Sequence, residues 1–395
     1  MSENSSAMVV RRALRFVILM GVISLLADVT YEGARSVNGQ FLFLLGASGA
    51  VVGLVAGAGE FLGYALRLFS GYLVDRTRRY WLFAGLGYLI NLLSVPALAL
   101  AGSWQAAALL MLLERLGKAV RNPARDVMLS QAGSRLGRGF SFGLHEALDQ
   151  IGAVLGPALA SGVLALQGNY RQAYALFGVT ALLALAVLLL ARLNYPRPEE
   201  MEEGKAVSNM AKFGRAFWLY LVATGLVAAG YADFPLIAFR LEKAQLAPAS
   251  WLPLVYALAM GTDALGALLF GRLFDRLGPK VLVVAVALPS MFAPLVFLGS
   301  FTAAIFGMFF WGLGMGAQES ILRAAVAGLV PAQRRGTAYG LFNAAYGLSW
   351  FAGSALMGML LESSPCALVM FSLVTQMAAA VLFLAKRKLF TSTET

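Results

Sequence analysis

Long apolar segments separated by short polar turns cover nearly the whole chain. A helix needs about 20 apolar residues to cross the hydrocarbon core of a bilayer, at a rise of about 1.5 Å per residue. The pattern therefore predicts twelve membrane-spanning helices, six in each half of the chain. They are expected at residues 14–37, 41–74, 80–102, 104–130, 139–166, 171–193, 215–239, 250–277, 279–299, 301–330, 335–361 and 364–385.

The stretch 194–214 interrupts the apolar pattern. It contains Pro196, Pro198 and a group of glutamates, a composition typical of a linker. We therefore expect an all-α membrane protein with an N-terminal six-helix bundle at 1–193, a cytoplasmic linker at 194–214 and a C-terminal six-helix bundle at 215–395.

Composition supports a membrane protein. Hydrophobic residues make up 59% of the chain and charged residues only 13%, against about 25% in soluble domains. The net charge of +11 does not indicate nucleic-acid binding, because the cations gather in short turns between apolar spans. Most of these turns fall on one side of the membrane, which by the positive-inside rule is the cytoplasmic side. We expect a prokaryotic cytoplasmic membrane, with both termini in the cytoplasm.

Cysteine and histidine are nearly absent. The single cysteine, Cys366, excludes an intrachain disulfide or a cysteine-cluster metal site, and the single histidine, His145, argues against a histidine-rich one. A lone histidine is more often a hydrogen-bonded structural group. We expect no metal and no cofactor. An enzyme is not expected either, because no nucleophile–base pair or glycine-rich phosphate loop is apparent.

Two sequence repeats indicate an internal duplication. A charged turn follows the second predicted helix and returns 200 positions later after the eighth; its residues are Gly71, Asp75, Arg76 and Arg79 in the first copy and Gly271, Asp275 and Arg276 in the second. The start of the fifth helix, 138–144, is likewise similar to the start of the eleventh, 335–341. Repeats at matching places in two halves are typical of duplicated transporters.

The charged turn resembles the loop 2–3 signature of the major facilitator superfamily, although Arg78 stands where the family usually has glycine. The resemblance implies twelve helices in two bundles related by a pseudo-twofold axis, and transport by alternating access. It also implies that the turns act as a gate. Asp75 would then dock near Gly336 and Asp275 near Gly139, where helix N-termini favour a carboxylate.

Carboxylates within the predicted spans are the candidates for proton coupling, because an ionisable group inside a membrane is costly unless it is used. These residues are Asp28, Glu32, Glu60 and Asp149. Asp28 and Glu32 are four positions apart and share a helix face. The alternative is a structural pair neutralised by Arg35, three residues further on.

Several polar and aromatic residues in the spans are candidates for substrate binding. They are Arg67, Arg115, Glu146, Asn343, Tyr346 and Trp350. Aromatic faces combined with carboxylates suit an amphipathic organic cation, and ordinary helix packing is the alternative. Glu114 lies elsewhere on the helical wheel and need not pair with Arg115. We expect Arg121, Arg125 and Asp126 to form a structural salt network with the loop 2–3 charges, and Glu319 to pair with Arg323.

Gly152, Gly156 and Pro157 in the fifth helix form a Gly-x-x-x-Gly-Pro motif. It resembles a motif of the facilitator drug antiporters and implies export by exchange, although such a motif also occurs for packing alone. We therefore expect a monomeric, proton-coupled exporter of a small amphipathic organic molecule. The alternatives are a proton-linked symporter of a nutrient or organic acid, with Arg67, Arg115 and Arg323 as anion ligands, and a non-transporting membrane scaffold or sensor.

Overall fold

The structure is a computed structural model that describes residues 3–136, 138–167, 169–197, 213–330 and 335–385. Over these residues the regular structure is helical. The α-helices are α1 (Glu3–Leu44), α2 (Gly49–Thr77), α3 (Tyr80–Ala97), α4 (Trp104–Leu136), α5 (Arg138–Gln167), α6 (Tyr170–Asn194), α7 (Arg215–Ala229), α8 (Phe234–Lys243), α9 (Trp251–Leu277), α10 (Val281–Ala287), α11 (Phe292–Phe297), α12 (Phe301–Leu329), α13 (Arg335–Ser363) and α14 (Pro365–Ala385). Three short 3₁₀ segments join them: η1 (Leu98–Leu100), η3 (Gly278–Lys280) and η4 (Pro289–Met291).

Eleven segments of the described chain are long and apolar enough to cross a membrane. They match eleven of the twelve predicted spans, and the helix α4 occupies the remaining one. At 33 residues α4 is long enough to span, but its apolar character is broken by seven ionisable residues: Glu114, Arg115, Lys118, Arg121, Arg125, Asp126 and Arg135. The predicted twelve-helix fold is therefore present, with α4 as its most polar member.

Two predicted spans are interrupted rather than continuous. The span 215–239 is divided into α7 and α8, because Asp233 caps the first turn of α8 and Pro235 lies within that turn. The span 279–299 is divided into α10 and α11 around Pro289, which cannot donate a backbone hydrogen bond to the preceding turn. Broken helices at membrane depth expose backbone groups that are tolerated only where protein or water satisfies them.

The chain forms two compact units. Unit 1 comprises Met1–Ala34 and Leu66–Ala206, and unit 2 comprises Arg35–Ala65 and Val207–Thr395. The units differ from the predicted bundles in one segment, 35–65, which holds the end of α1 and the start of α2. The two six-helix bundles remain a prediction.

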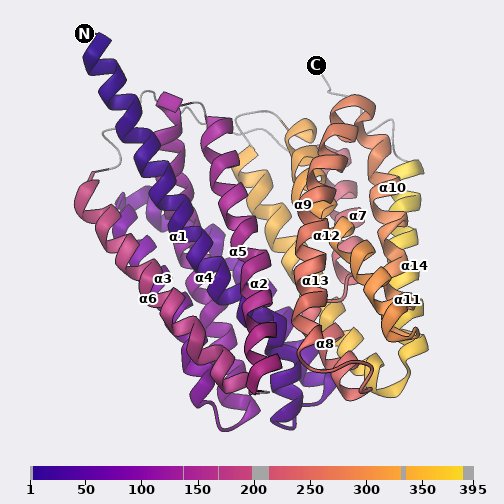
Figure 1. Cartoon of the computed structure of the whole chain (residues 1–395). Helices are drawn as coiled ribbons and strands as arrows, with labels where there is room; N and C mark the ends of the chain where they lie inside the picture. The colour runs from indigo at the N-terminus through magenta and orange to yellow at the C-terminus, as the bar shows by residue number, and fades with distance from the viewer. Residues whose placement is uncertain (1–2, 137, 168, 198–212, 331–334, 386–395) are drawn as a thin grey trace. The chain divides into compact units, whose positions relative to one another are not determined.

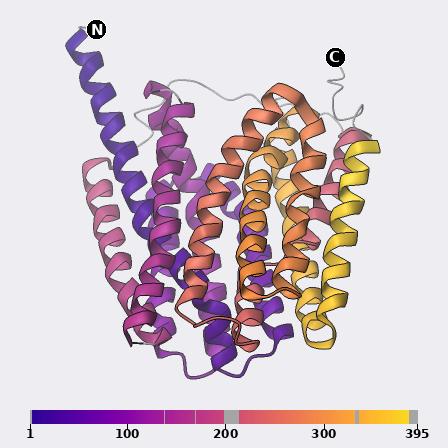
Figure 2. The same cartoon turned by 45° about the vertical axis from the view of Figure 1, so that its right-hand side comes forward.

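Within unit 1, α3 packs along α4 and α6, and α4 packs along α5 (Figure 1). Within unit 2, α9 packs along α12, and α14 packs along α7, α10 and α11 (Figure 2). The segment 35–65 joins unit 2 through close helix contacts. A Cβ atom on Gly53 would lie 2.3 Å from the carbonyl oxygen of Ser354 on α13, so only glycine permits this approach. The backbone nitrogen of Gly49 also donates a hydrogen bond of 2.7 Å to Glu362.

Candidate functional site

Arg35 on α1 bridges two carboxylates inside unit 2. Its Nη2 atom lies 2.7 Å from Oδ1 of Asp233 and 3.1 Å from Oε1 of Glu60. Asp233 is only 1% exposed and also accepts a hydrogen bond of 2.8 Å from the backbone nitrogen of Phe234. The break between α7 and α8 thus places a fixed carboxylate against α1 and α2. We call Arg35, Glu60 and Asp233 the outer triad.

The outer triad was only partly predictable. Glu60 was expected to be a proton-coupling residue, and Arg35 only a neutralising cation. Asp233 was not singled out, although an acid between Tyr231 and a Phe-Pro sequence is a recognisable helix-capping signal. The pairing itself joins residues 198 positions apart, and no local pattern encodes it.

A second group of charges lies inside unit 1, where α1 faces α4. The Nζ atom of Lys118 lies 3.8 Å from Oε1 of Glu32 and 3.9 Å from the centre of the Tyr31 ring. Asp28, one turn earlier on α1, is buried, and its Oδ1 atom has no hydrogen-bond partner among the described residues. The two predicted acids of α1 therefore lie in a buried, polar environment. Their role in proton coupling stays a prediction.

Arg121 on α4 is fully buried between two aromatic rings. Its guanidinium carbon lies 4.4 Å from the centre of the Tyr88 ring and 5.4 Å from that of Tyr31. Its three guanidinium nitrogens have no hydrogen-bond partner in the described part of the chain. The salt network that we expected with the loop 2–3 charges is therefore not formed by this side chain. Arg125 instead pairs with its neighbour Asp126, at 2.9 Å.

Glu114 and Arg115 form an ion pair, contrary to the expectation that they need not pair. The Nε atom of Arg115 lies 3.3 Å from Oε2 of Glu114. Adjacent residues project about 100° apart on a helix, but two long side chains can bend toward each other across that angle. Glu114 also accepts a hydrogen bond of 2.7 Å from Nδ2 of Asn91 on α3. This contact holds the carboxylate inside unit 1.

The glycines of the α5 motif lie directly against α1. A Cβ atom on Gly152 would lie 2.4 Å from the carbonyl oxygen of Leu25 and 2.9 Å from Cβ of Asp28. A Cβ atom on Gly156 would lie 2.4 Å from the carbonyl oxygen of Val29. The two glycines thus pack α5 closely against α1, and the choice between export and packing alone stays a prediction. These glycines set the distance between α5 and the acidic face of α1.

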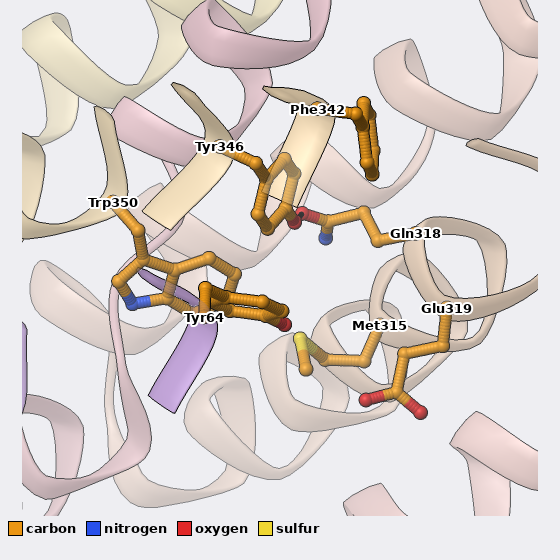
Figure 3. A pocket seen from close by; sticks show the side chains of 7 residues that line it. All are labelled: Tyr64, Met315, Gln318, Glu319, Phe342, Tyr346 and Trp350. Carbon is orange, nitrogen blue, oxygen red and sulfur yellow. Dashed lines mark hydrogen bonds between the residues drawn. The ribbon is translucent and has the colours of Figure 1, made fainter. Parts of the chain in front are cut away.

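A pocket in unit 2 is lined by residues of α2, α12 and α13 (Figure 3): Tyr64, Met315, Gln318, Glu319, Phe342, Tyr346 and Trp350. The hydroxyl group of Tyr346 donates a hydrogen bond of 2.5 Å to Oε1 of Gln318. The centre of the Tyr346 ring lies 5.6 Å from the centre of the Tyr64 ring and 5.7 Å from that of Trp350. Trp350 is 2% exposed, and its Nε1 atom has no hydrogen-bond partner among the described residues.

The carboxylate of Glu319 lies on one side of the aromatic group (Figure 3). The space enclosed by the pocket is about 10 Å³, enough for about one water molecule. The pocket in this form is thus an aromatic wall with one acid beside it rather than a cavity of substrate size.

The structure places the other predicted substrate residues apart from this pocket. Tyr346 and Trp350 line it, whereas Asn343 is half-buried and is not among the lining residues. Arg67 is half-buried on the part of α2 that belongs to unit 1, and Glu146 is exposed on α5. Arg323 has its side chain outside the described residues, so its predicted pairing with Glu319 is not described.

Sequence reasoning missed Tyr64 and Gln318 as pocket residues. The sequence could have pointed to Gln318, because a polar amide within an apolar helix must find a hydrogen-bond partner.

The predicted gate turns lie at the ends of α2 and α9. Asp75, Arg76 and Arg79 are exposed, and Gly71 and Gly271 are half-buried. Arg276 is exposed too, while the side chain of Asp275 lies outside the described residues. The docking regions that we expected around Gly139 and Gly336 also lie outside the described side chains. The gate role stays a prediction.

The two turns share a backbone feature that the sequence partly concealed. Gly278 has a φ of 66°, and Arg78, at the matching place 200 positions earlier, has a φ of 53°. A positive φ favours glycine, so the first turn keeps a positive φ at the position where Arg78 stands in place of the family's usual glycine. The departure from the family pattern therefore changes the side chain without removing this positive φ.

Comparison with known proteins decides the family. The sequence profile of the Major Facilitator Superfamily matches residues 13–354 and 234–392. The chain belongs to this superfamily. It is 42% identical over 382 residues to an uncharacterized protein of Mycobacterium bovis, covering 95% of this chain and 93% of that one. It is 27% identical to an uncharacterized MFS-type transporter of Methanocaldococcus jannaschii, covering 93% and 94% of the two chains.

Solved structures agree on the fold. The crystal structure of the nucleoside transporter NupG superposes with a TM-score of 0.72 at 14% identity, covering 96% of this chain and all of that one. At this identity the likeness shows the fold alone. Membership of the superfamily makes this chain a multi-pass membrane protein and a secondary transporter of a small molecule. The drug-antiporter subgroup is a finer assignment than these comparisons reach.

Proposed function

We propose that this superfamily member is a proton-coupled exporter of a small amphipathic organic cation. The observation that carries the proposal is the outer triad, in which one guanidinium group holds two carboxylates within membrane-spanning helices. The three side chains together carry one positive and two negative charges. Protonation of one acid leaves Arg35 paired with the other, so the guanidinium group keeps a carboxylate partner whether the proton is bound or released.

Glu60 is the acid of the triad that would carry the proton. Asp233 makes the shorter contact to Arg35 and is also held by the backbone nitrogen of Phe234. Glu60 has the longer contact, 3.1 Å, and its side chain is the more exposed of the two acids. In unit 1, Glu32 offers a second loading point, paired loosely with Lys118 at 3.8 Å.

The substrate class follows from the pocket of unit 2. Its described lining combines four aromatic residues, two of them tyrosines, with one acid, Glu319. A cation is attracted to the faces of aromatic rings and to a carboxylate, while an apolar body packs against the same rings. The pocket must widen to admit such a molecule, which is what alternating access provides in transporters of this kind.

The direction of transport rests on the α5 motif. Gly152, Gly156 and Pro157 resemble the antiporter motif, and the two glycines hold α5 against the acidic face of α1. The distribution of Lys and Arg supports a cytoplasmic membrane with both termini inside. Monomeric action and protons as the coupling ion belong to the same proposal.

One observation favours a second candidate function, proton-linked uptake of an organic acid. Arg121 is buried, and its nitrogens have no hydrogen-bond partner among the described residues. Lys118 lies against the same ring of Tyr31. A substrate carboxylate could accept hydrogen bonds from both cations. The export proposal is preferred because Glu32 and Asp28 already supply negative charge close to them.

Purified protein in liposomes that enclose a pH-sensitive dye tests the proposal. With an outward-directed gradient of tetraphenylphosphonium or ethidium, we expect protons to move inward as the cation leaves. The same liposomes loaded with benzoate test the alternative, in which acid and proton leave together. Proton movement that accompanies benzoate and not either cation would refute cation export, and movement with neither would refute proton coupling for both classes.

A further inference from the structure

Three potential metal ligands lie together near the start of α5. His145, Glu146 and Asp149 each offer one ligand atom, and these atoms all lie within 4.8 Å of one another. His145 and Asp149 are four residues apart, so they share a face of the helix. Glu146 follows His145 directly and reaches the group with its longer side chain.

Two buried atoms of this group, one on His145 and one on Asp149, lack hydrogen-bond partners among the described residues. His145 is 3% exposed, and its Nε2 atom has no hydrogen-bond partner in the described part of the chain. The Oδ1 atom of Asp149 is also buried without such a partner. A buried polar atom without a partner costs about 1–3 kcal/mol. A bound cation would satisfy both atoms at once.

The surrounding charges are compatible with a cation. Arg125 is engaged by Asp126 at 2.9 Å, and Lys118 by Glu32 at 3.8 Å. Arg121 lies between Tyr31 and Tyr88. Two of these three cations thus have carboxylate partners of their own, and a divalent ion bound by Glu146 and Asp149 would have two ligands of opposite charge.

The geometry points to a binding site for a divalent transition-metal ion with His145, Glu146 and Asp149 as its ligands. One imidazole nitrogen and two carboxylates are the donors that Zn²⁺, Mn²⁺, Fe²⁺ and Co²⁺ accept. An imidazole ligand disfavours Mg²⁺ and Ca²⁺, which prefer oxygen. Three protein ligands leave at least one coordination position for water. The inference departs from our expectation of no metal, but it agrees with the argument against a histidine-rich site, because it uses the single histidine of the chain.

This site goes beyond the proposed function and does not depend on it. Glu146 and Asp149 serve the ion here, and proton coupling is left to Glu32 and Glu60. The ion would lie in the membrane-spanning part of α5, which begins near residue 144.

Co²⁺ is the probe for the experiment, because its visible absorption reports ligand type and geometry. The protein is purified without a histidine tag and with Cys366→Ser, because Cys366 is an exposed thiol that could bind the probe. We expect saturable absorption of a nitrogen–oxygen site, displaced by Zn²⁺ and not by Mg²⁺. Loss of an outer-shell partner lowers metal affinity roughly 10–100-fold. We expect His145→Gln and Asp149→Asn each to lower the affinity for Co²⁺ by more than this.

Glu319→Gln is the matched control. It removes a carboxylate in unit 2, outside the α5 site, and should leave Co²⁺ binding unchanged. Glu146 is exposed, so Glu146→Gln provides a ligand variant that keeps the packing of α5 even where the buried variants fail to fold. Absence of saturable Co²⁺ absorption in the parent protein would overturn the inference. Equal Co²⁺ affinity in the parent and in Glu146→Gln would do the same. Neither readout measures transport, so the result for Co²⁺ does not decide whether the proposed function is correct.

Discussion

The Nη2 atom of Arg35 lies 2.7 Å from Oδ1 of Asp233, although 198 positions separate the two residues. The contact joins the later part of α1 to the break between α7 and α8, and the same nitrogen reaches Glu60 on α2. Three helices thus meet at one guanidinium group. A change in the charge of either acid changes how tightly these helices are held.

Glu60→Gln should uncouple transport from the proton gradient. Glutamine matches the size of glutamate but cannot take up a proton, while Arg35 keeps its ion pair with Asp233. We expect protein stability to change by about 1 kcal/mol, the typical net contribution of one hydrogen bond. Proton flux and substrate flux are measured together in liposomes.

Asp233→Asn is the control for this prediction, because asparagine can still cap α8. It should retain part of the coupling through Glu60. Wild-type proton-to-substrate flux in Glu60→Gln would show that the outer triad is only structural.

Glu32→Gln should also impair coupling, by removing the acid that faces Lys118. The amide leaves Lys118 without its partner inside unit 1, and a buried unpaired ammonium is costly. We therefore expect lower stability as well, which the double variant Glu32→Gln/Lys118→Gln should partly restore. Thermal unfolding in detergent and pH-gradient-driven flux are the two measurements. A single variant with unchanged values in both would contradict the role of this pair.

Gly156→Ala should destabilise the protein by about 1–3 kcal/mol, because its Cβ atom would collide with the carbonyl oxygen of Val29. Gly162→Ala on the same helix is a matched control, since a Cβ atom there would meet nothing within 4 Å. The control should be neutral or stabilising by about 0.5–1 kcal/mol, because alanine favours a helix. Melting temperatures compare the two. Equal shifts would show that α5 and α1 can move apart without cost.

Gly278→Ala should lower stability by about 1–3 kcal/mol. Gly278 has a φ of 66° and a ψ of −155°, a region that is nearly restricted to glycine. Arg78→Gly at the matching turn should act in the opposite direction and stabilise by up to about 1 kcal/mol, because it relieves a positive φ at a non-glycine residue. Denaturation of the two variants gives the signs, and matching signs would contradict the shared turn geometry.

Trp350→Leu should weaken binding of an organic cation about tenfold, which corresponds to about 1.4 kcal/mol. Leucine keeps an apolar side chain but removes the aromatic face next to Tyr346. Trp218→Leu on α7 is the control, since Trp218 is 50% exposed and is not among the pocket-lining residues. Binding of tetraphenylphosphonium is measured by titration calorimetry. Equal affinities in both variants would remove Trp350 from the substrate site.

Features of the fold that repeat along the chain could be read from the sequence. Apolar segments of about 20 residues located the spans, and the duplicated turn around Asp75 indicated an internal repeat. The breaks at Asp233 and Pro289 were missed, because the apolar pattern continues across both. The pair of Glu114 and Arg115 was missed because a helical wheel fixes the direction of Cβ and not that of a long side chain.

The sequence by itself determined that the chain lies in a bilayer, which stretches of it can span that bilayer, and which residues carry costly charges inside them. Only the tertiary structure decided the partners: Arg35 with Asp233 and Glu60, Lys118 with Glu32, and Tyr346 with Gln318. The physical reason is the separation along the chain of the residues that each property depends on. Burial in lipid depends on local composition, whereas an ion pair depends on which distant helices pack together.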